Sequence, residues 1–240
     1  MTDMRTLRFY VTPEHDCSYL PQHRARTLFV DPQARIDDDS YTQLSELGFR
    51  RSGSHIYRPH CDGCRACISV RLPVHSFQRN SAQRRTWHRN HDLSVSQVRP
   101  QLTDEYYNLY ARYIEARHAD GDMYPPTPSQ FHNFLVEGHQ QTSFFTFRDP
   151  KDKLLCIAVT DCLGNGLSAL YTFYDPTQSQ RSLGTYAILW QIEETRRRQL
   201  PHLYLGYWVK ACRKMKYKAG FQPLEMLIDG HWSRLLQDSF

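Results

Sequence analysis

The fold is decided by residues 143–198, SFFTFRDPKDKLLCIAVTDCLGNGLSALYTFYDPTQSQRSLGTYAILWQIEETRRR. Within them, three runs rich in β-branched and aromatic residues predict antiparallel strands: 143–148, 154–161 and 167–174. The turn sequences Asp149-Pro150-Lys151-Asp152 and Gly164-Asn165-Gly166 separate these runs. A helix is predicted over residues 183–198, at a loop that contains glycine.

The segments on either side complete the pattern. Downstream we predict a strand, a short helix and a strand: 203–206, 211–217 and 225–228. Upstream we predict one helix over residues 103–117, with Thr103 as its N-cap, and another over 127–136. This order suggests an α+β chain with an acyltransferase fold of the GNAT type. We expect a GNAT-like domain over residues 101–240 and a smaller α+β domain, which contains most of the cysteines, over residues 1–100.

Composition excludes several classes of protein. The chain has 240 residues, of which 40% are hydrophobic and 13% aromatic, so it is globular rather than disordered. No run approaches the roughly 18 apolar residues of a spanning helix, and MTDMRTLRFY lacks the apolar core of a signal peptide, so we expect no membrane partner and a cytoplasmic location. The net charge of +5 permits a polyanionic partner without requiring one. Seven cysteines, an odd number, favour thiols or a metal site over a disulfide framework.

The sharpest local motif is His60-Cys61-Asp62-Gly63-Cys64-Arg65-Ala66-Cys67. Cys61 and Cys64 have the spacing at which two thiolates point at one ion across a tight turn, and Cys67 repeats that spacing. A fourth ligand would come from one of three residues: Cys17, His15 or His60. The alternative is that the cysteines pack as ordinary buried thiols, because a complete second pair is missing.

The start of the predicted helix at Ser182-Leu183-Gly184-Thr185 is a candidate anion site. Backbone N–H groups there have no partner within the helix, and Gly184 permits close approach of a phosphate or an oxyanion. Ordinary capping explains Ser and Gly at this position equally well. The phenols of Tyr171 and Tyr174 and the carboxylate of Asp175 precede the loop, and together with an anion site they resemble a reaction centre.

Two clusters of cations suggest a nucleic-acid partner. The first surrounds a predicted basic helix at residues 81–91: Arg79, Arg84, Arg85 and Arg89. The second fills a stretch without Asp or Glu: Lys210, Arg213, Lys214, Lys216 and Lys218. Aromatic residues such as Trp87 and Tyr207 are interleaved, which suits a single-stranded RNA end, although a solvated basic face is the plainer interpretation.

Arg117 and His118 end the predicted helix over residues 103–117. Two cationic groups favour a helix C-terminus through its dipole, which is a sufficient structural reason for both. The same pair could hold a substrate carboxylate, with the arginine making a forked contact and the histidine a switchable one.

Taken together, these segments resemble the arginyl-tRNA-protein transferase family. Four segments resemble the amino-terminal half of that family: Cys17-Ser18-Tyr19-Leu20, Gly48-Phe49-Arg50-Arg51-Ser52-Gly53, Tyr57-Arg58-Pro59 and the three-cysteine motif. Its carboxy-terminal half is resembled by residues 110–124, 171–176, 182–186, 204–207 and 212–218. The short length and the form of the segment at Cys17 look like the bacterial aspartate/glutamate leucyltransferase subfamily.

The resemblance implies transfer of leucine from leucyl-tRNA to the α-amine of a protein that begins with Asp or Glu, a mark for N-degron proteolysis. Family members have a GNAT-like catalytic half and use no acetyl-CoA. On this basis the predicted catalytic residues are Asp175 or His118 as general base, and Tyr174. The predicted substrate-binding residues are Arg117, His118, Tyr171, Ser182, Leu183, Gly184, Tyr186 and Tyr207. The predicted tRNA-binding residues are Arg84, Arg85, Lys214, Lys216 and Lys218.

The resemblance also bears on cofactors and partners. No cofactor is required for the transfer, and no DNA is expected as a partner. Eukaryotic relatives are associated with an iron-sulfur cluster on amino-terminal cysteines, one pair of which is spaced Cys-x-x-Cys. Here Leu20 occupies the position of the second cysteine of that pair, three residues after Cys17. One ligand is therefore absent unless Cys67 takes its place. An iron-sulfur cluster or zinc on Cys17, Cys61, Cys64 and Cys67 is therefore the metal prediction.

Two alternatives remain open at this point. An acetyl-CoA-dependent acetyltransferase of the GNAT type would explain the element order, but residues 180–185 offer one glycine where Gly-x-Gly would bring the backbone closer to a pyrophosphate. A non-enzymatic, metal-stabilised RNA-binding adaptor would explain the cysteines and the cations. It leaves Tyr174, Asp175 and Gly184 without a purpose.

Overall fold

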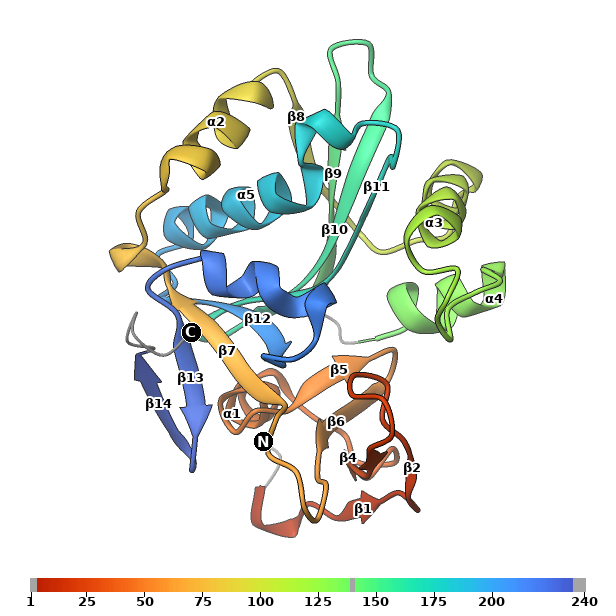
Figure 1. Cartoon of the computed structure of the whole chain (residues 1–240), viewed down its shortest axis with the longest axis vertical. Coiled ribbons are helices and arrows are strands. Elements are labelled where there is room, and N and C mark those ends of the chain that lie inside the picture. The colour runs from red at the N-terminus through yellow and green to blue at the C-terminus, as the bar shows by residue number, and fades with distance from the viewer. Residues whose placement is uncertain (1–3, 139–140, 235–240) are drawn as a thin grey trace.

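The computed structural model describes residues 4–138 and 141–234, and within these ranges a large mixed sheet dominates the chain (Figure 1). Its eight strands run in this order: β14 (His231–Arg234), β13 (Glu225–Ile228), β7 (Ile68–Pro73), β12 (His202–Trp208), β11 (Gly166–Tyr174), β10 (Leu154–Leu163), β9 (Thr142–Arg148) and β8 (Ser94–Val98). Neighbouring strands are antiparallel except β11 and β12, which are parallel. The α+β class and the predicted meander of three strands are confirmed.

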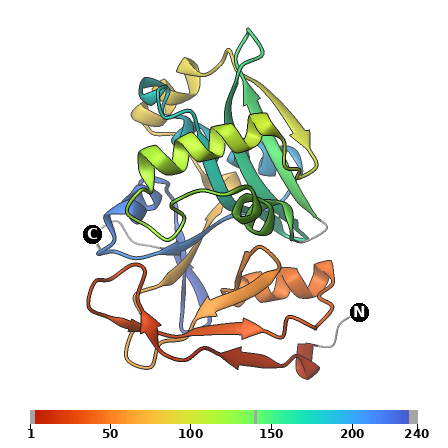
Figure 2. The same ribbon diagram turned by 90° about the vertical axis from the view of Figure 1, so that its right-hand side faces the viewer.

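Helices cover both faces of this sheet (Figures 1 and 2). One face packs against α5 (Leu183–Arg197), which carries a nearly continuous buried surface because its apolar residues recur at helical spacing. Helix α2 (Ser81–Arg89) lies beside α5 and begins with a capping box between Asn80 and Gln83. The other face packs against α3 (Asp104–Arg117) and α4 (Pro128–Phe131), whose aromatic residues meet those of β9 to β11.

Short helical turns join these elements. They are η2 (Val74–Ser76), η3 (His132–Val136), η4 (Ser179–Arg181) and η5 (Arg213–Gly220). The segment predicted as one helix over residues 127–136 is therefore α4 followed by the wider turn η3, and the short helix predicted over residues 211–217 begins and ends slightly later, as η5.

The amino-terminal part forms a second, smaller sheet below the first (Figure 2). Its strand order is β1 (Phe9–Val11), β4 (Thr27–Val30), β6 (His55–Pro59) and β5 (Arg50–Ser52), with α1 (Asp38–Glu46) between β4 and β5. The turn η1 (Met4–Thr6) and the pair β2 (His15–Asp16) and β3 (Arg24–Ala25) complete it. This sheet packs against the large one through Leu163 and Tyr204.

The large sheet draws strands from both sides of residue 100. Strand β7 lies between β12 and β13, and β8 forms the edge beside β9. We did not predict β7 as a strand, although residues 68–72 alternate apolar and polar side chains; the polar positions Ser69 and Arg71 are buried as well as the apolar ones. The division of the chain into residues 1–100 and 101–240 stays a prediction.

The parallel pair β11 and β12 splits soon after it forms. The two strands are in register from Gly166–His202 to Ser168–Tyr204, after which β11 continues to Tyr174 and β12 to Trp208. A β-bulge at Leu205 and a positive φ of 77° at Gly206 accompany the divergence. We call this divergence the strand split. Beyond it, β11 and β12 no longer pair with each other in the middle of the sheet.

In the described ranges, no helix has the length and apolar character needed to cross a membrane.

Candidate active site

The side chains of Arg117 and Tyr174 meet at the open end of the strand split. Arg117 is the last residue of α3 and Tyr174 the last residue of β11, and Nη2 of the arginine donates a hydrogen bond to the tyrosine hydroxyl over 3.1 Å. The ring of Tyr113 lies 4.9 Å from that of Tyr174 and 5.4 Å from that of His118, measured between centroids. Tyr113 thus packs between His118 and Tyr174, two predicted site residues from distant parts of the sequence.

His118 is the C-cap of α3 and is partly exposed. Burial lowers the pKa of His118 below its ordinary value of 6.5, the positive charges of Lys214 and Arg117 lower it further, and Asp120 acts in the opposite direction. Lys214 and Asp120 form an ion pair with a separation of 2.9 Å. The imidazole is therefore neutral at pH 7 and able to accept a proton.

The first turn of α5 lies beside Tyr174. A Cβ at Gly184 would be 3.1 Å from Cε1 of the Tyr174 ring, so glycine allows this close approach. Ser182, the N-cap, has a left-handed backbone with φ 52° and makes no side-chain capping bond. The N–H groups at the start of α5 therefore lack the usual side-chain acceptor and are free to face an anion.

Ion pairs and hydrogen bonds hold the loop that leads into α5. Arg181 makes a forked contact with Asp92 over 2.9 and 2.8 Å, and the amide nitrogen of Asn90 donates to the Arg181 carbonyl over 2.8 Å. The loop is thereby tied to the end of α2. A fixed loop gives the first turn of α5 a defined direction toward Tyr174.

Tyr171 belongs to the same group of rings. Its ring lies 6.3 Å from that of Tyr113, and its hydroxyl lies 3.6 Å from the sulfur of Met123. Burial first, and then the neighbouring phenols, raise the pKa of Tyr171 well above its ordinary value, so it remains protonated. Tyr171 contributes a flat aromatic wall rather than an acid or a base.

Asp175 lies apart from this group. Its carboxylate is fully buried, accepts hydrogen bonds from the backbone and the hydroxyl of Thr177, and pairs with Lys153 over 2.9 Å. Burial alone would raise the pKa of Asp175, but these bonds outweigh it and the pKa lies below its ordinary value. A carboxylate with both oxygens occupied is a weak proton acceptor, so the geometry favours a role in shaping the turn after β11.

Three further predicted substrate-binding residues lie in the core. Leu183 and Tyr186 point from α5 into the cluster around Phe147, and the Tyr186 ring packs on Trp87 at 5.5 Å. The hydroxyl of Tyr207 donates to the Gly48 carbonyl over 2.9 Å, which ties β12 to the small sheet. These residues support the site from behind and do not reach its surface.

Of the five predicted tRNA-binding residues, four are exposed in the structure and one is buried. Arg84 and Arg85 on α2, and Lys214 and Lys216 on η5, are exposed. Lys218 is buried, with 7% of its surface exposed, and its Nζ donates to the Tyr207 carbonyl. A lysine held in this way cannot also lie on the surface against a phosphate.

Three of the predicted metal ligands, Cys17, Cys61 and Cys64, lie near the fourth, Cys67. Burial first, and then the charges of Cys17, Cys61 and Cys64, raise the pKa of Cys67 to about 12. Yet among residues 4–138 and 141–234, no three His, Cys, Asp or Glu side chains lie close enough to hold a metal ion. The described side chains thus do not form a ligand set, and the metal stays a prediction.

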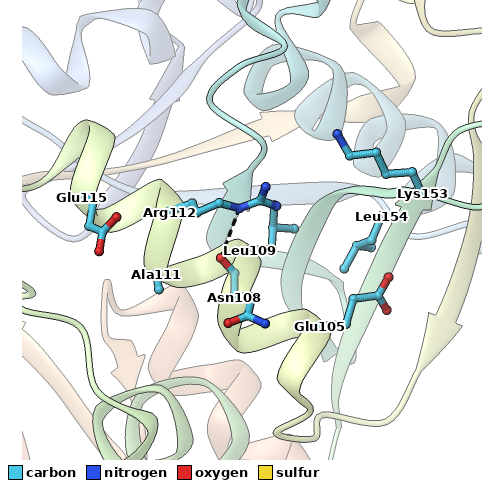
Figure 3. A pocket seen from close by; sticks show the side chains of 8 residues that line it. All are labelled: Glu105, Asn108, Leu109, Ala111, Arg112, Glu115, Lys153 and Leu154. Atoms are coloured by element: carbon cyan, nitrogen blue, oxygen red, sulfur yellow. Dashed lines mark hydrogen bonds between the residues drawn. The ribbon is translucent and has the colours of Figure 1, made fainter.

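A groove of about 560 Å³ lies between α3 and the start of β10 (Figure 3). Its lining is mixed in charge: Glu105, Asn108, Leu109, Ala111, Arg112, Glu115, Lys153 and Leu154. No residue predicted for catalysis or binding lines this groove. Lys153, which also pairs with Asp175, links the two regions.

Comparison with known proteins identifies the family. The model described as "Arginine-tRNA-protein transferase, C terminus" matches residues 105–228, which is more than half of the chain, and the corresponding N-terminus model matches residues 15–85. The chain belongs to the arginine-tRNA-protein transferase family. It is therefore an aminoacyltransferase, and aminoacyl-tRNA is its substrate.

Full-length relatives of this transferase carry a narrower name. A protein of Hahella chejuensis is 55% identical over 97% of this chain and 99% of its own length, and one of Marinobacter nauticus is 56% identical over 99% and 100%. Both are named aspartate/glutamate leucyltransferase. Among solved structures, FemX aligns over 85% of this chain and 80% of its own with 10% identity and a TM-score of 0.46.

The sequence did not reveal every residue of this transferase site. Tyr113 lies one helical turn before Arg117, so helical spacing alone could have found it. Lys153 lies in a turn, and nothing in the sequence indicates its pairing with Asp175.

Proposed function

We propose that this transferase moves leucine from leucyl-tRNA to the α-amine of proteins that begin with Asp or Glu, and so marks them for proteolysis by an N-degron pathway. The observation that carries the proposal is the convergence of His118, Tyr174 and the first turn of α5 at the strand split. The full-length likeness to two proteins named aspartate/glutamate leucyltransferase supports the choice of donor and acceptor.

The chemistry requires little beyond positioning and one proton transfer. The acceptor nitrogen attacks the leucyl carbonyl, a C–N bond forms, and the C–O bond to the terminal ribose breaks. Because the donor is already an ester, holding amine and carbonyl in contact supplies several kcal/mol. An α-amine has a pKa of about 8 and is mostly protonated at neutral pH, so a neutral base beside it helps.

His118 is the residue that we assign as this base. Its lowered pKa keeps it neutral, and it takes the proton that the nitrogen loses on attack and passes it to the departing ribose oxygen. The N–H groups of the first turn of α5 stabilise the oxyanion. Arg117 holds the hydroxyl of Tyr174 in place, and the Tyr174 and Tyr171 rings, both packed on Tyr113, flank the reacting groups.

The basic surface of α2 and η5 is proposed to bind the tRNA. The two elements meet where the amide nitrogen of Gln83 donates to the Gly220 carbonyl over 3.0 Å. Arg84, Arg85 and Lys216 are exposed there and suit the phosphates of an acceptor stem. Since charged tRNA and newly exposed protein N-termini meet in the cytoplasm, we propose that the reaction takes place there.

One assay tests the proposal. Purified protein is given labelled leucyl-tRNA and peptides that begin with Asp, Glu or Ala, and the label on each peptide is measured. Label on the Asp and Glu peptides alone is the expected result. RNA binding without transfer would favour the adaptor, transfer from labelled acetyl-CoA would favour the acetyltransferase, and transfer from arginyl-tRNA instead would overturn the choice of donor.

A further inference from the structure

Arg50 is a buried cation with no carboxylate beside it. The structure buries two other arginines to a similar degree, and each is paired: Arg51 with Asp161 over 2.9 Å and Arg71 with Glu225 over 2.8 Å. In the described part of the chain, Arg50 has polar contacts only with neutral oxygens, since Nη1 donates to the Ser168 hydroxyl and Nη2 to the Ala169 carbonyl, each over 2.9 Å. Buried charges are as a rule paired, so Arg50 lacks a counter-charge.

Lys218 is a second buried basic side chain without a carboxylate beside it. Its Nζ donates to the Tyr207 carbonyl, and the described residues place no carboxylate within ion-pair distance of it. Arg50 and Lys218 contact neighbouring residues of β12, Gly206 and Tyr207. Burial first, and the charge of Arg50 second, lower the pKa of Lys218 to about 7. Two neighbouring cations without an anion are unfavourable in a protein interior.

Both cations lie at the strand split. Arg50 contacts β11 at Ser168 and Ala169, where the register with β12 ends. On the other side it lies against Gly206, at which a Cβ would be 3.3 Å from the guanidinium. Lys218 reaches Tyr207, the next residue of β12. The cations therefore lie between the two diverging strands, at the closed end of the opening whose other end is Tyr174.

The structure also connects the cations to the reaction site. Tyr217 precedes Lys218 on η5, and both Arg50 and Tyr174 act electrostatically on its hydroxyl. Its phenol therefore lies near both groups. Arg117, the exposed cation of the site, is occupied with the Tyr174 hydroxyl, and an exposed charge contributes little selectivity.

We propose that Arg50 and Lys218 form the pocket for the side-chain carboxylate of the acceptor's first residue. This rests on the proposed function and adds the residues that select the acceptor. In Asp and Glu only a few bonds separate the α-amine from the carboxylate, so the pocket requires the bound acceptor's α-amine to lie within the strand split, between the cations and Tyr174. The planar guanidinium sets the direction of the contact, and the flexible ammonium adjusts to the two side-chain lengths. The carboxylate supplies the missing counter-charge.

Replacing Lys218 tests the pocket without removing the fold. In Lys218→Met an apolar side chain of similar length replaces the buried amine, and thermal melting verifies folding. Peptides that differ only in their first residue, Asp, Glu, Asn or Gln, are titrated with labelled leucyl-tRNA at saturation. We expect kcat/KM for the Asp and Glu peptides to fall by about 10- to 100-fold, mainly through KM, with the rates for Asn and Gln unchanged. Arg50→Gln, which keeps a donor for the Ala169 carbonyl, should show the same pattern.

The matched control is Lys151→Met, which changes an exposed lysine in the turn between β9 and β10 and should leave all rates unchanged. A folded Lys218→Met protein that keeps the wild-type preference for Asp over Asn overturns the pocket. So does a loss confined to the affinity for leucyl-tRNA, because the cations would then serve a phosphate. If the wild-type protein labels no peptide, the proposed function itself fails. In that case direct binding of an Asp-Ala dipeptide against Asn-Ala, measured by calorimetry on wild type and variants, still decides whether the cations bind a carboxylate.

Discussion

Arg51 donates hydrogen bonds from Nε and Nη2 to the two carboxylate oxygens of Asp161, both over 2.9 Å, and so joins β5 of the small sheet to β10 of the large one. The hydroxyls of Tyr41 and Thr142 donate to the same carboxylate, each over 2.6 Å. A buried carboxylate with four donors fixes the orientation of α1 and β9 as well. This network is the main polar connection between the two sheets.

Asp161→Asn should therefore destabilise the protein. The substitution leaves the Arg51 guanidinium buried beside a neutral amide, which costs about 3–5 kcal/mol in the free energy of unfolding. Urea denaturation followed by circular dichroism measures this cost. Asp152→Asn, at an exposed turn, is the control and should change stability by less than about 0.5 kcal/mol.

The same pair makes stability depend on acid pH. Burial would raise the pKa of Asp161, but the bonds from Arg51, Thr142 and Tyr41 outweigh it and hold the pKa below its ordinary value of 3.8. Its contribution to stability is therefore present above pH 3.8 and is lost as the pH falls through the lowered pKa. Urea midpoints between pH 7 and pH 2 should show this loss in the wild type and a smaller one in Asp161→Asn.

The ion pair of Lys214 with Asp120 should set the pKa of His118, the proposed base. Lys214 lowers the pKa of His118 and Asp120 raises it, so Lys214→Met should move the acidic limb of kcat to higher pH and Asp120→Asn should move it to lower pH. Rates at saturating substrates over pH 5–8 measure both shifts. If the acidic limb of kcat lies at the same pH in both variants and the wild type, His118 is not the base. In that case His118→Asn should lose much less than about 100-fold in kcat.

Gly184 should be sensitive to one methyl group. In Gly184→Ala the new Cβ would be 3.1 Å from the Tyr174 ring, so the ring or the first turn of α5 must shift. We expect kcat to fall by about 10- to 100-fold with little change in the melting temperature, because small displacements of reacting groups are costly. Gly220→Ala, where a Cβ meets nothing within 4 Å, is the matched control and should keep the wild-type rate.

Salt dependence separates the surface cations from the buried one. Arg84→Ala or Lys216→Ala should weaken leucyl-tRNA binding and reduce the slope of log K against log salt by about 0.7–0.9, the release of one counterion. Lys218→Met should leave that slope unchanged, since the side chain is buried. Filter binding at several salt concentrations gives the slopes, and an equal loss in Lys218→Met would place this lysine on the tRNA.

The order of the elements was predictable because local pattern decides it. The β-forming residues of β10 and β11, the N-cap at Thr103 and the turn at Gly164 are local signals, and the structure confirms the elements that they predict. Strand β7 was missed because its environment comes from far along the chain. Arg71 in its middle reads as exposed until its pairing with Glu225 of β13 is known.

The sequence predicted the site residues that lie in recognisable local motifs, and not those whose role depends on contacts between distant residues. Arg117, Tyr174 and Gly184 come together in the structure, as their chemistry suggested, but Asp175 turns away to Thr177 and Lys153. Whether a carboxylate faces a site or a neighbouring turn depends on side-chain contacts that periodicity does not encode. The burial of Lys218 could not be predicted from the sequence either, because the stretch around it is rich in basic residues and looks like an exposed surface.

The central position of β7 sets an order of events during synthesis. This strand leaves the ribosome early, yet both of its partners, β12 and β13, are encoded close to the other end of the chain. Until residues 202–228 emerge, β7 exposes two unpaired edges with apolar side chains, a condition that invites pairing with other chains. Nascent chains that stop before residue 202 should therefore depend on chaperones, because the central strand of the large sheet has no partners until then.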